Sequence, residues 1–316
     1  MEECVCTLEG IMNSPRLTII IPTLQAGRTL HDSLDSVLCQ RFRDFEILIM
    51  DSVSRDNTLD IARGYAAKDH RVRVQSSPDK GVYDAMNKGV AEARGEWVFF
   101  LGSDDRLHNE HVLETFFSSP GVSDFDMVYG NVVSPAFKGV YDGPFTLEKL
   151  MHRNIPHQAV FYKKDVFRIV GGFRIRYKAY ADWDLNIRCF NEPRVRNRYI
   201  DLIVADFGAE GVSSRHDVPF LREVMISEKL RWLNRAGIRT LRSVKVFDEW
   251  WRLLRNAAVR DGDDLKECVN GEKIPQPLRR MIDWQSRIPP RFLRKGFFSK
   301  PVMFLNYISN LLTASF

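Results

Sequence analysis

Short apolar runs alternate with amphipathic stretches through the N-terminal third of the chain. The runs are rich in β-branched and aromatic residues, which predicts buried strands, and the amphipathic stretches repeat apolar residues at helical spacing. Strands are predicted at Leu17–Ile21, which Pro22 should stop, and at Phe45–Met50, Val72–Gln75 and Trp97–Leu101, with helices at Thr29–Gln40, Leu59–Ala67 and Val82–Ala93. Strands that alternate with helices through short connections predict an α/β fold with a doubly wound, mostly parallel sheet.

The pattern becomes less regular after Asp105. A helix is predicted at His111–Phe117, a strand at Met127–Val133, and a further helix at Ala181–Phe190, whose acidic first turn suits the positive end of the helix dipole. From about Val218 the composition shifts to Leu, Trp, Arg and Lys at helical spacing. The predicted parts are an N-terminal tail at 1–16, an α/β domain at 17–217 and a basic helical C-terminal region at 218–316.

Cysteine usage and the chain ends indicate the compartment. The five cysteines are scattered along 316 residues and none forms a CxxC pair. This odd, scattered set argues against a disulfide framework or structural zinc and favours a reducing compartment. The N-terminus MEECVCTLEG is acidic and lacks the apolar core of a signal peptide, and no apolar run is long enough to cross a bilayer. A cytoplasmic protein is therefore expected.

Charge is distributed unevenly along the chain. Residues 215–316 carry 20 Lys and Arg against 11 Asp and Glu, whereas the remainder carries 26 against 30. A basic end on a mildly acidic body predicts a phosphate-rich partner, either an anionic membrane surface or a nucleic acid. Basic residues are interleaved with Trp and Phe near Trp250–Arg255 and in PPRFLRKGFFSKPVMFLNYISNLL, which suits peripheral binding at the inner face of a membrane. The alternative is an amphipathic helix packed on the α/β domain.

Two adjacent carboxylates, Asp104 and Asp105, follow the predicted strand Trp97–Leu101 after Gly102 and Ser103. A bare acidic pair is often only a helix cap or a solvated loop. Carboxylates at the carboxyl edge of an α/β sheet, however, are well placed to hold a divalent cation and a phosphate-bearing ligand. Mg²⁺ or Mn²⁺ is the expected metal, since both prefer carboxylate and phosphate oxygens.

Five sequence blocks follow one another along the chain in this order: PTLQAGRTLHDSLDSVLCQ, ILIMDSVSRDNTLDIA, DKGVYDAMNKGVAEARGEWVFFLGSDD, NIPHQAVFYKKDVF and YKAYADWDLNIR. Together they resemble family 2 glycosyltransferases of the GT-A fold, from about Leu17 to Val212. The pattern GVYDAMNKG…GSDD with HQ and ADWDLNIRCF is most similar to enzymes that glycosylate phenolic glycolipids in mycobacteria. It also resembles transferases of bacterial exopolysaccharide and colanic-acid type. The resemblance implies a Rossmann-like GT-A domain with a helical C-terminal extension.

The resemblance assigns donor-binding roles to residues that follow the predicted strands. Asp51 would accept the imide N–H of a uracil or guanine base, and the backbone of Pro22 and Thr23 would flank that base. Asp104 would face the ribose and Asp105 would ligate the metal. The alternative role for Asp51 is to cap the following helix.

Three further residues are expected near the nucleotide. Gly81 permits a positive φ angle or a close backbone approach, and Lys80 is a candidate to meet ribose or phosphate oxygens, although a solvated lysine is an equal alternative. Asn87 lies in an otherwise apolar helix, which propensity does not explain, so a role in supporting the metal loop or the nucleotide is predicted. Tyr83 is interpreted as core.

The acceptor side is assigned from the last two blocks. In the family, a carboxylate base takes the proton of the acceptor hydroxyl. At the position of the family's usual pair of acids this chain has Ala181-Asp182, so the first acid is missing and Asp182 is the base candidate. The alternative is that Asp182 is a plain helix cap. Asp184 is expected to bind Arg188 one helical turn later. A sugar or acceptor pocket is assigned to His157, Gln158 and Trp183, and Arg215 and His216 are candidates to close over the diphosphate.

The sequence therefore predicts an inverting, metal-dependent hexosyltransferase. It would move a sugar from a UDP-, GDP- or dTDP-sugar to a hydroxyl of a lipid-linked, glycolipid or polysaccharide-precursor acceptor. Two alternatives stay open, namely a non-catalytic nucleotide- or nucleic-acid-binding protein and a metal-dependent nucleotidyltransferase. The acidic α/β domain and the Asp104–Asp105 pair disfavour a nucleic-acid partner.

Overall fold

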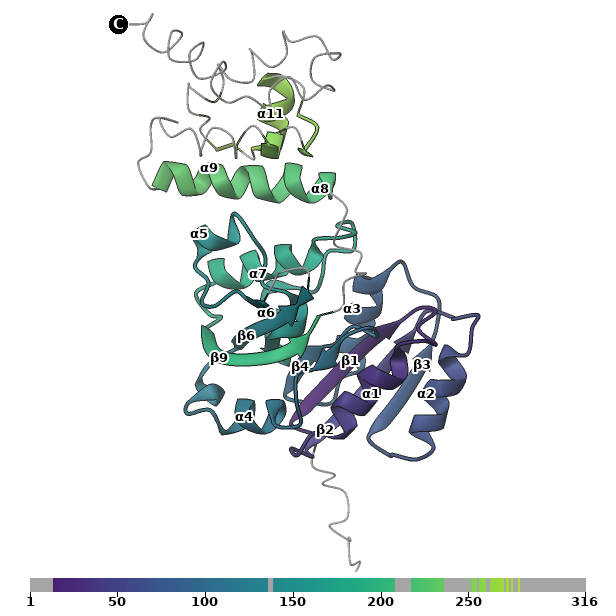
Figure 1. Ribbon diagram of the computed structural model, residues 1–316. Coiled ribbons are helices and arrows are strands. Elements are labelled where there is room, and N and C mark those ends of the chain that lie inside the picture. The colour runs from purple at the N-terminus through teal and green to yellow at the C-terminus, as the bar shows by residue number, and fades with distance from the viewer. Residues whose placement is uncertain are drawn as a thin grey trace, which may run out of the picture. The chain divides into compact units, whose positions relative to one another are not determined.

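The computed structural model describes residues 14–135, 139–207, 217–235 and a subset of those between 250 and 278. The chain divides into two compact units, Met1–Arg215 and His216–Phe316. The first is a layered α/β unit and the second is helical in its described part (Figure 1).

A nine-stranded mixed sheet forms the centre of the first unit, in the order β3-β2-β1-β4-β8-β6-β9-β5 with β7 paired to β6. The strands β1 to β4 are parallel to one another, β8 runs antiparallel to both β4 and β6, and β9 runs parallel to β6. The strands are β1 Leu17–Thr23, β2 Phe45–Asp51, β3 Val72–Ser76, β4 Trp97–Phe100, β5 Arg106–Leu107, β6 Met127–Ser134, β7 Gly139–Tyr141, β8 Val160–Lys163 and β9 Asn197–Asp206. The predicted mostly parallel α/β fold is confirmed.

The helices cover the sheet. Helices α1 and α2 lie side by side in Figure 1 and are joined by the Tyr65 hydroxyl, which donates to Asp35. Helix α3 packs on β1 so closely that a side chain on Gly89 would place its Cβ 2.6 Å from Ile20 Cγ2. The helices are α1 Leu30–Leu38, α2 Thr58–Ala66, α3 Val82–Glu92, α4 Val112–Ser118, α5 Leu147–Leu150, α6 Lys164–Val170 and α7 Ala181–Asn191, with the short 3₁₀ turns η1 Val122–Asp124 and η3 His157–Ala159.

The prediction that Pro22 stops the first strand is wrong, because β1 continues through Pro22 to Thr23. The pairing of β1 with β4 ends at Ile20 and Phe100, whereas its pairing with β2 continues to Thr23 and Asp51. The Ile20 carbonyl faces β4, where it accepts a hydrogen bond from Leu101 N–H. Backbone groups two residues apart in a strand face the same side, so the backbone nitrogen of Pro22 also faces the β4 side, but beyond the point where the β1–β4 pairing ends. The missing N–H of proline therefore removes no ladder bond.

Aromatic packing fixes the position of β4. The Phe99 ring stacks on Phe161 of β8 at a centroid distance of 4.5 Å, and Phe116 of α4 stacks on Phe161 at 3.9 Å. All three side chains are fully buried, and burial of each stabilises the fold by about 1.5–3 kcal/mol. This core holds the end of β4, from which the Asp104–Asp105 pair emerges, in a defined place.

The described part of the second unit contains α8 Val218–Phe220, a π-helical turn at Leu221–Met225, α9 Ile226–Arg235 and α11 Gly262–Cys268. Within it, Arg222 forms an ion pair with the buried Asp264. Trp251, Arg255 and the basic stretch from Arg279 onward lie outside the described residues.

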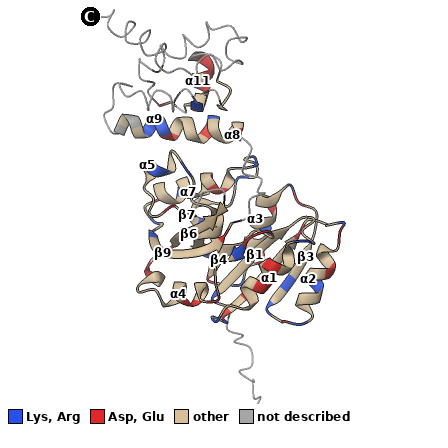
Figure 2. Ribbon diagram, in the orientation of Figure 1, with Lys and Arg blue, Asp and Glu red and all other residues tan. Residues whose placement is uncertain are grey.

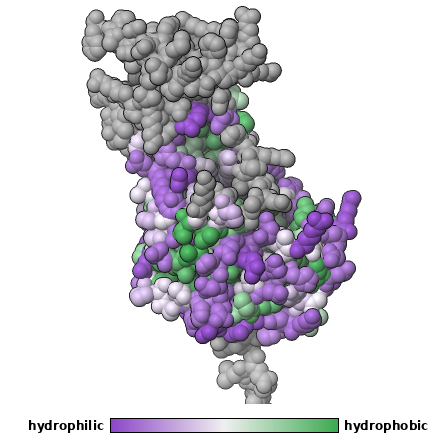
Figure 3. Space-filling model, viewed as in Figure 1, coloured by the Kyte–Doolittle hydropathy of each residue, from purple (hydrophilic) through white to green (hydrophobic). Residues whose placement is uncertain are grey.

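No helix in the described ranges combines the length and the apolarity needed to span a membrane. Figure 2 shows Lys, Arg, Asp and Glu interspersed over the first unit. On the face drawn in Figure 3, hydrophilic residues cover most of the described surface.

Candidate active site

The carboxyl ends of β1 and β2 meet at one edge of the sheet, where Thr23 and Asp51 are register partners. Asp51 is buried, and its Oδ2 accepts a hydrogen bond of 2.6 Å from the Ser76 hydroxyl at the end of β3. The Ser54 N–H also donates to this carboxylate, at 3.2 Å from Oδ2. At the start of α2, Thr58 N–H donates to the Asp56 carboxylate and not to Asp51. The observed contacts of Asp51 therefore do not match the alternative in which it caps α2.

Strained turns follow both of these strand ends. Gln25 and Val53 have left-handed φ angles of 52° and 54°. Ser52 N–H donates to the Thr23 carbonyl at 2.9 Å, so the two loops are tied together. Leu24 and Val53 keep 61% and 51% of their surface exposed, so they are not part of the core. Backbone strain in a β-branched residue often accompanies a functional loop.

The two acids after β4 differ in environment. Asp104 is exposed, whereas Asp105 is buried, and Asp105 Oδ2 accepts from Gly102 N–H at 3.2 Å and from Gln158 Nε2 at 2.7 Å. A Cβ at Gly102 would lie 2.3 Å from Asp105 Oδ2, so any larger residue there would displace the carboxylate. The buried carboxylate is therefore held in one orientation.

The donor set around Asp105 fits a shared metal site. Among the described residues, no group of three or more His, Cys, Asp or Glu side chains could hold a metal ion on its own. Mg²⁺ and Mn²⁺ in nucleotide-using enzymes commonly take one or two carboxylates and complete their coordination with phosphate oxygens and water. Asp105, with the exposed Asp104 beside it, offers this kind of site.

The loop before α3 has the backbone that its glycine predicts. Gly81 has φ 120°, and its N–H donates to Asp79. Lys80 N–H donates to Asp84, and its carbonyl accepts from Lys178 Nζ at 3.2 Å. These contacts fix the backbone of the loop and leave the predicted role of the Lys80 side chain untested.

Asn87 joins α3 to the loop after α6. Its Nδ2 donates to the Phe173 carbonyl and its Oδ1 accepts from Phe173 N–H, both at 2.8 Å. Gly172 must be small there, because a Cβ would lie 2.5 Å from Asn87 Oδ1. This pairing explains why an amide is placed in an apolar helix, and the predicted nucleotide contact of Asn87 stays a prediction.

Asp182 lies in the first turn of α7 and is 7% exposed. Its Oδ1 accepts from the Tyr83 hydroxyl at 2.9 Å and from Trp183 N–H at 2.8 Å, and its Oδ2 accepts from Asn154 Nδ2 at 2.9 Å. His157 Nδ1 lies 3.6 Å from Oδ2. Both oxygens of the carboxylate are thus oriented by other segments of the chain.

The consecutive residues His157 and Gln158 on η3 connect the two candidate functional carboxylates. His157 contacts Asp182, and Gln158 donates to Asp105. The base candidate and the metal-ligand candidate are therefore brought next to one turn of 3₁₀ helix. This juxtaposition places the two carboxylates on neighbouring parts of one site.

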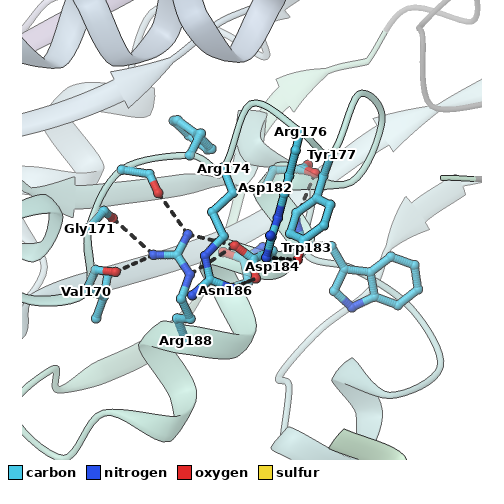
Figure 4. Close-up of polar contacts among 12 residues, drawn as sticks. Val170, Gly171, Arg174, Arg176, Tyr177, Asp182, Trp183, Asp184, Asn186 and Arg188 are labelled. Carbon is cyan, nitrogen blue, oxygen red and sulfur yellow. Dashed lines mark hydrogen bonds and ion pairs between the residues drawn. The ribbon is translucent and has the colours of Figure 1, made fainter. Parts of the chain in front are cut away.

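Asp184 makes ion pairs with two arginines, Arg174 and Arg188 (Figure 4). Its buried carboxylate binds Arg188 Nη2 at 2.8 Å, as the helical spacing predicts, and Arg174 Nη1 at 3.1 Å. Arg188 also donates to the carbonyls of Val170, Gly171 and Gly172. The pair fastens the glycine loop to α7, so we assign it a structural function.

Trp183, the neighbour of Asp182 on α7, is half-buried. Its indole Nε1 donates to the Leu150 carbonyl at 2.7 Å, and its ring packs edge-on to Tyr180. Arg215 and His216, the candidates for a diphosphate contact, lie outside the described residues.

The sequence interpretation missed the residues that orient Asp182. Tyr83 was assigned to the core, and its ring is indeed buried, but its hydroxyl reaches Asp182. Nothing in the sequence indicates a role for Asn154 except its position shortly before His157 and Gln158. Its Oδ1 accepts from the fully buried Asn186, which in turn accepts from the Tyr162 hydroxyl at 2.7 Å.

Comparison with known proteins places this site in a family. Residues 18–183 match the profile described as Glycosyl transferase family 2. A "PGL/p-HBAD biosynthesis glycosyltransferase" of Mycobacterium bovis BCG is 38% identical over 253 residues, which cover 78% of this chain and 96% of that protein, and one from Mycobacterium tuberculosis H37Rv is equally similar.

The solved structures agree on the GT-A fold. S. aureus TarS 1–349, in complex with UDP-GlcNAc, superposes with a TM-score of 0.62 at 18% identity and covers 89% of this chain and 92% of that one. The mannosyltransferase PcManGT from Pyrobaculum calidifontis, in complex with GDP-Man and Mn²⁺, gives a TM-score of 0.50 at 16% identity, over 95% and 87% of the two chains. The profile match and the mycobacterial relatives agree with the fold, and this chain belongs to glycosyl transferase family 2.

Proposed function

We propose that this glycosyltransferase acts in glycolipid biosynthesis by inverting transfer from a nucleotide-diphosphate sugar to an acceptor hydroxyl. The observation that carries the proposal is the η3 turn, on which Gln158 holds Asp105 and His157 contacts Asp182. A donor diphosphate at Asp105 would therefore lie close to the base that activates the acceptor. The similarity to the mycobacterial proteins named for PGL/p-HBAD biosynthesis supports a glycolipid acceptor.

The donor site is proposed at the edge formed by β1, β2 and β4. Asp51 would accept the imide N–H of uracil or guanine, because its carboxylate already lies buried and oriented by Ser76 at the strand end. Thr23 would lie beside the same base, as the register partner of Asp51. Lys80, Gly81 and Asp104 would contribute to the ribose and diphosphate contacts.

Asp105 and Asp104 would hold Mg²⁺ or Mn²⁺, which would offset charge on the departing diphosphate. Asp182 would accept the proton of the acceptor hydroxyl, whose oxygen bonds to the anomeric carbon as the carbon–diphosphate bond breaks. A single displacement of this kind inverts the anomeric configuration. Activation rests on positioning and electrostatics, and Trp183 would border the acceptor.

A donor screen tests the proposal. Binding to the native state raises its stability by mass action, so the true donor among UDP-, GDP- and dTDP-sugars with Mn²⁺ should raise the unfolding temperature most. Turnover of that donor with a membrane-lipid extract should release a nucleoside diphosphate, and NMR of the product should show the opposite anomer. Release of pyrophosphate would instead indicate a nucleotidyltransferase, and retention of the anomer would contradict the single displacement.

Peripheral membrane binding is also proposed, from the basic charge of residues 215–316. Each basic residue near an anionic surface contributes about 1 kcal/mol, and salt weakens that attraction. Cosedimentation with anionic vesicles should therefore fall as salt rises and should fall further when the chain is truncated near Val218. Equal partitioning of the full-length and truncated proteins would show that this region does not bind lipid.

A further inference from the structure

The Tyr83 hydroxyl lies between two acceptors in the buried part of the site. Its oxygen is 2.9 Å from Asp182 Oδ1 and 3.0 Å from the Ala179 carbonyl oxygen. A phenol carries a single O–H hydrogen, so it can make a strong, near-linear hydrogen bond to only one of these oxygens at a time. Whether the Tyr83 hydrogen points to Asp182 or to the Ala179 carbonyl depends on which of the two is the stronger hydrogen-bond acceptor.

The charge on Asp182 decides this competition. While Asp182 is ionised, its carboxylate is the stronger acceptor, and the hydrogen bond from Tyr83 is charge-assisted. Once Asp182 has taken a proton it is neutral, and the amide carbonyl of Ala179 becomes the better acceptor. The hydroxyl is therefore paired in both states, which matters because an unpaired buried hydroxyl costs free energy.

The surroundings hold Tyr83 in this position. The side chain is 7% exposed, and its ring stacks on Phe173 at a centroid distance of 5.4 Å. Phe173 is itself tied to α3 by the two hydrogen bonds of Asn87. On the opposite oxygen of Asp182, Asn154 fixes the carboxylate from the other side. The hydroxyl hydrogen can thus turn while the heavy atoms stay in place.

We infer that Tyr83 is a positioning residue for the transfer reaction, whose hydroxyl hydrogen shifts from Asp182 to the Ala179 carbonyl as Asp182 accepts the proton of the acceptor. In that step the acceptor oxygen forms its bond to the anomeric carbon, the diphosphate leaves with the electron pair of the broken bond, and the acceptor proton goes to Asp182. Tyr83 itself neither gains nor loses a proton. This inference rests on the proposed role of Asp182 as the base.

The inference is tested with Tyr83→Phe, which keeps the ring and removes only the hydroxyl. Nucleoside diphosphate release is measured with the donor that the thermal screen selects and a membrane-lipid extract as acceptor. We expect kcat to fall about tenfold with the KM for the donor unchanged, because the hydroxyl acts on the base and not on donor binding. Tyr65→Phe is the matched control, since Tyr65 also donates to a carboxylate, that of Asp35, outside the site.

A double-mutant cycle with Asp182→Asn separates positioning from a merely structural role. If Tyr83 acts through Asp182, adding Tyr83→Phe to Asp182→Asn should cost little further activity. Two fully multiplicative losses, or a Tyr83→Phe enzyme with normal kcat beside an inactive Asp182→Asn enzyme, would overturn the inference and leave the proposed base intact. An active Asp182→Asn enzyme would instead overturn the proposed base. Unfolding midpoints of all variants show that the fold is retained.

Discussion

The proposed donor edge, around Asp51 and Asp105, and the proposed acceptor region, around Asp182, are built in different ways. Asp51 ends β2, and Asp105 lies in the short loop between β4 and β5, so strands place the backbone of both acids, and Asp105 has one distant side-chain partner, Gln158. Asp182, in contrast, is oriented by Tyr83 and Asn154, which lie 99 and 28 positions away in the sequence. A parallel sheet therefore provides a donor site through its strand ends. The acceptor region needs several distant segments to converge.

The largest effect is expected from the ion pair that fastens the acceptor region. Arg188→Met should lower the free energy of unfolding by up to about 3–5 kcal/mol, because among the described residues it leaves the buried Asp184 carboxylate paired with the partly exposed Arg174 alone. Chemical denaturation gives this value directly. The control is Arg168→Met, which removes an exposed ion pair with Asp165 and should change stability by less than about 1 kcal/mol. Equal effects would contradict the structural role of Arg188.

Replacement of the base candidate should mainly reduce turnover. Asp182→Asn should lower kcat by roughly 10²-fold or more while the donor still binds, because general-base catalysis is lost and the donor edge is unchanged. The assay is nucleoside diphosphate release, with donor binding followed by thermal shift. If Asp182→Asn keeps near-normal turnover and Asp184→Asn is folded but inactive, the wrong carboxylate has been assigned to the acceptor region.

The donor edge should respond to the metal instead. Asp105→Asn should retain the fold, since Asn can still accept from Gly102 and Gln158, but should lose the stabilisation by donor plus Mn²⁺. That stabilisation is about 2.7 kcal/mol for the wild type at a ligand concentration of 100 times Kd. Thermal shift with and without EDTA measures it. Wild-type transfer that continues unchanged in EDTA would exclude a metal role for Asp105.

This difference between strand-placed residues and residues brought together by distant segments also explains which parts of the fold and the site could be predicted from the sequence. The strand that ends at Asp51 and the strand that precedes the Asp105 loop follow from apolar runs of defined length, and the Asp184–Arg188 pair follows from helical spacing. Tyr83 could not be distinguished from a core residue, since its ring is buried and only its hydroxyl has a polar role. The continuation of β1 through Pro22 could not be predicted either, because it depends on where the neighbouring β4 ends.

The smallest effect concerns strain at the donor edge. Val53 is a β-branched residue with φ 54°, in a conformation that costs an L-residue about 1–2 kcal/mol and that glycine adopts freely. Glycine also gains entropy in the unfolded chain, which costs about 0.5–1 kcal/mol, so Val53→Gly should raise stability by up to about 1.5 kcal/mol. Gln25→Gly is the matched control, with φ 52° but an unbranched side chain, and it should gain less. The midpoint of chemical denaturation at unchanged slope reports both values. A clear loss of stability in Val53→Gly would mean that the Val53 side chain contributes contacts that outweigh its strain, and that the loop beside Asp51 is held by packing as the acceptor region is.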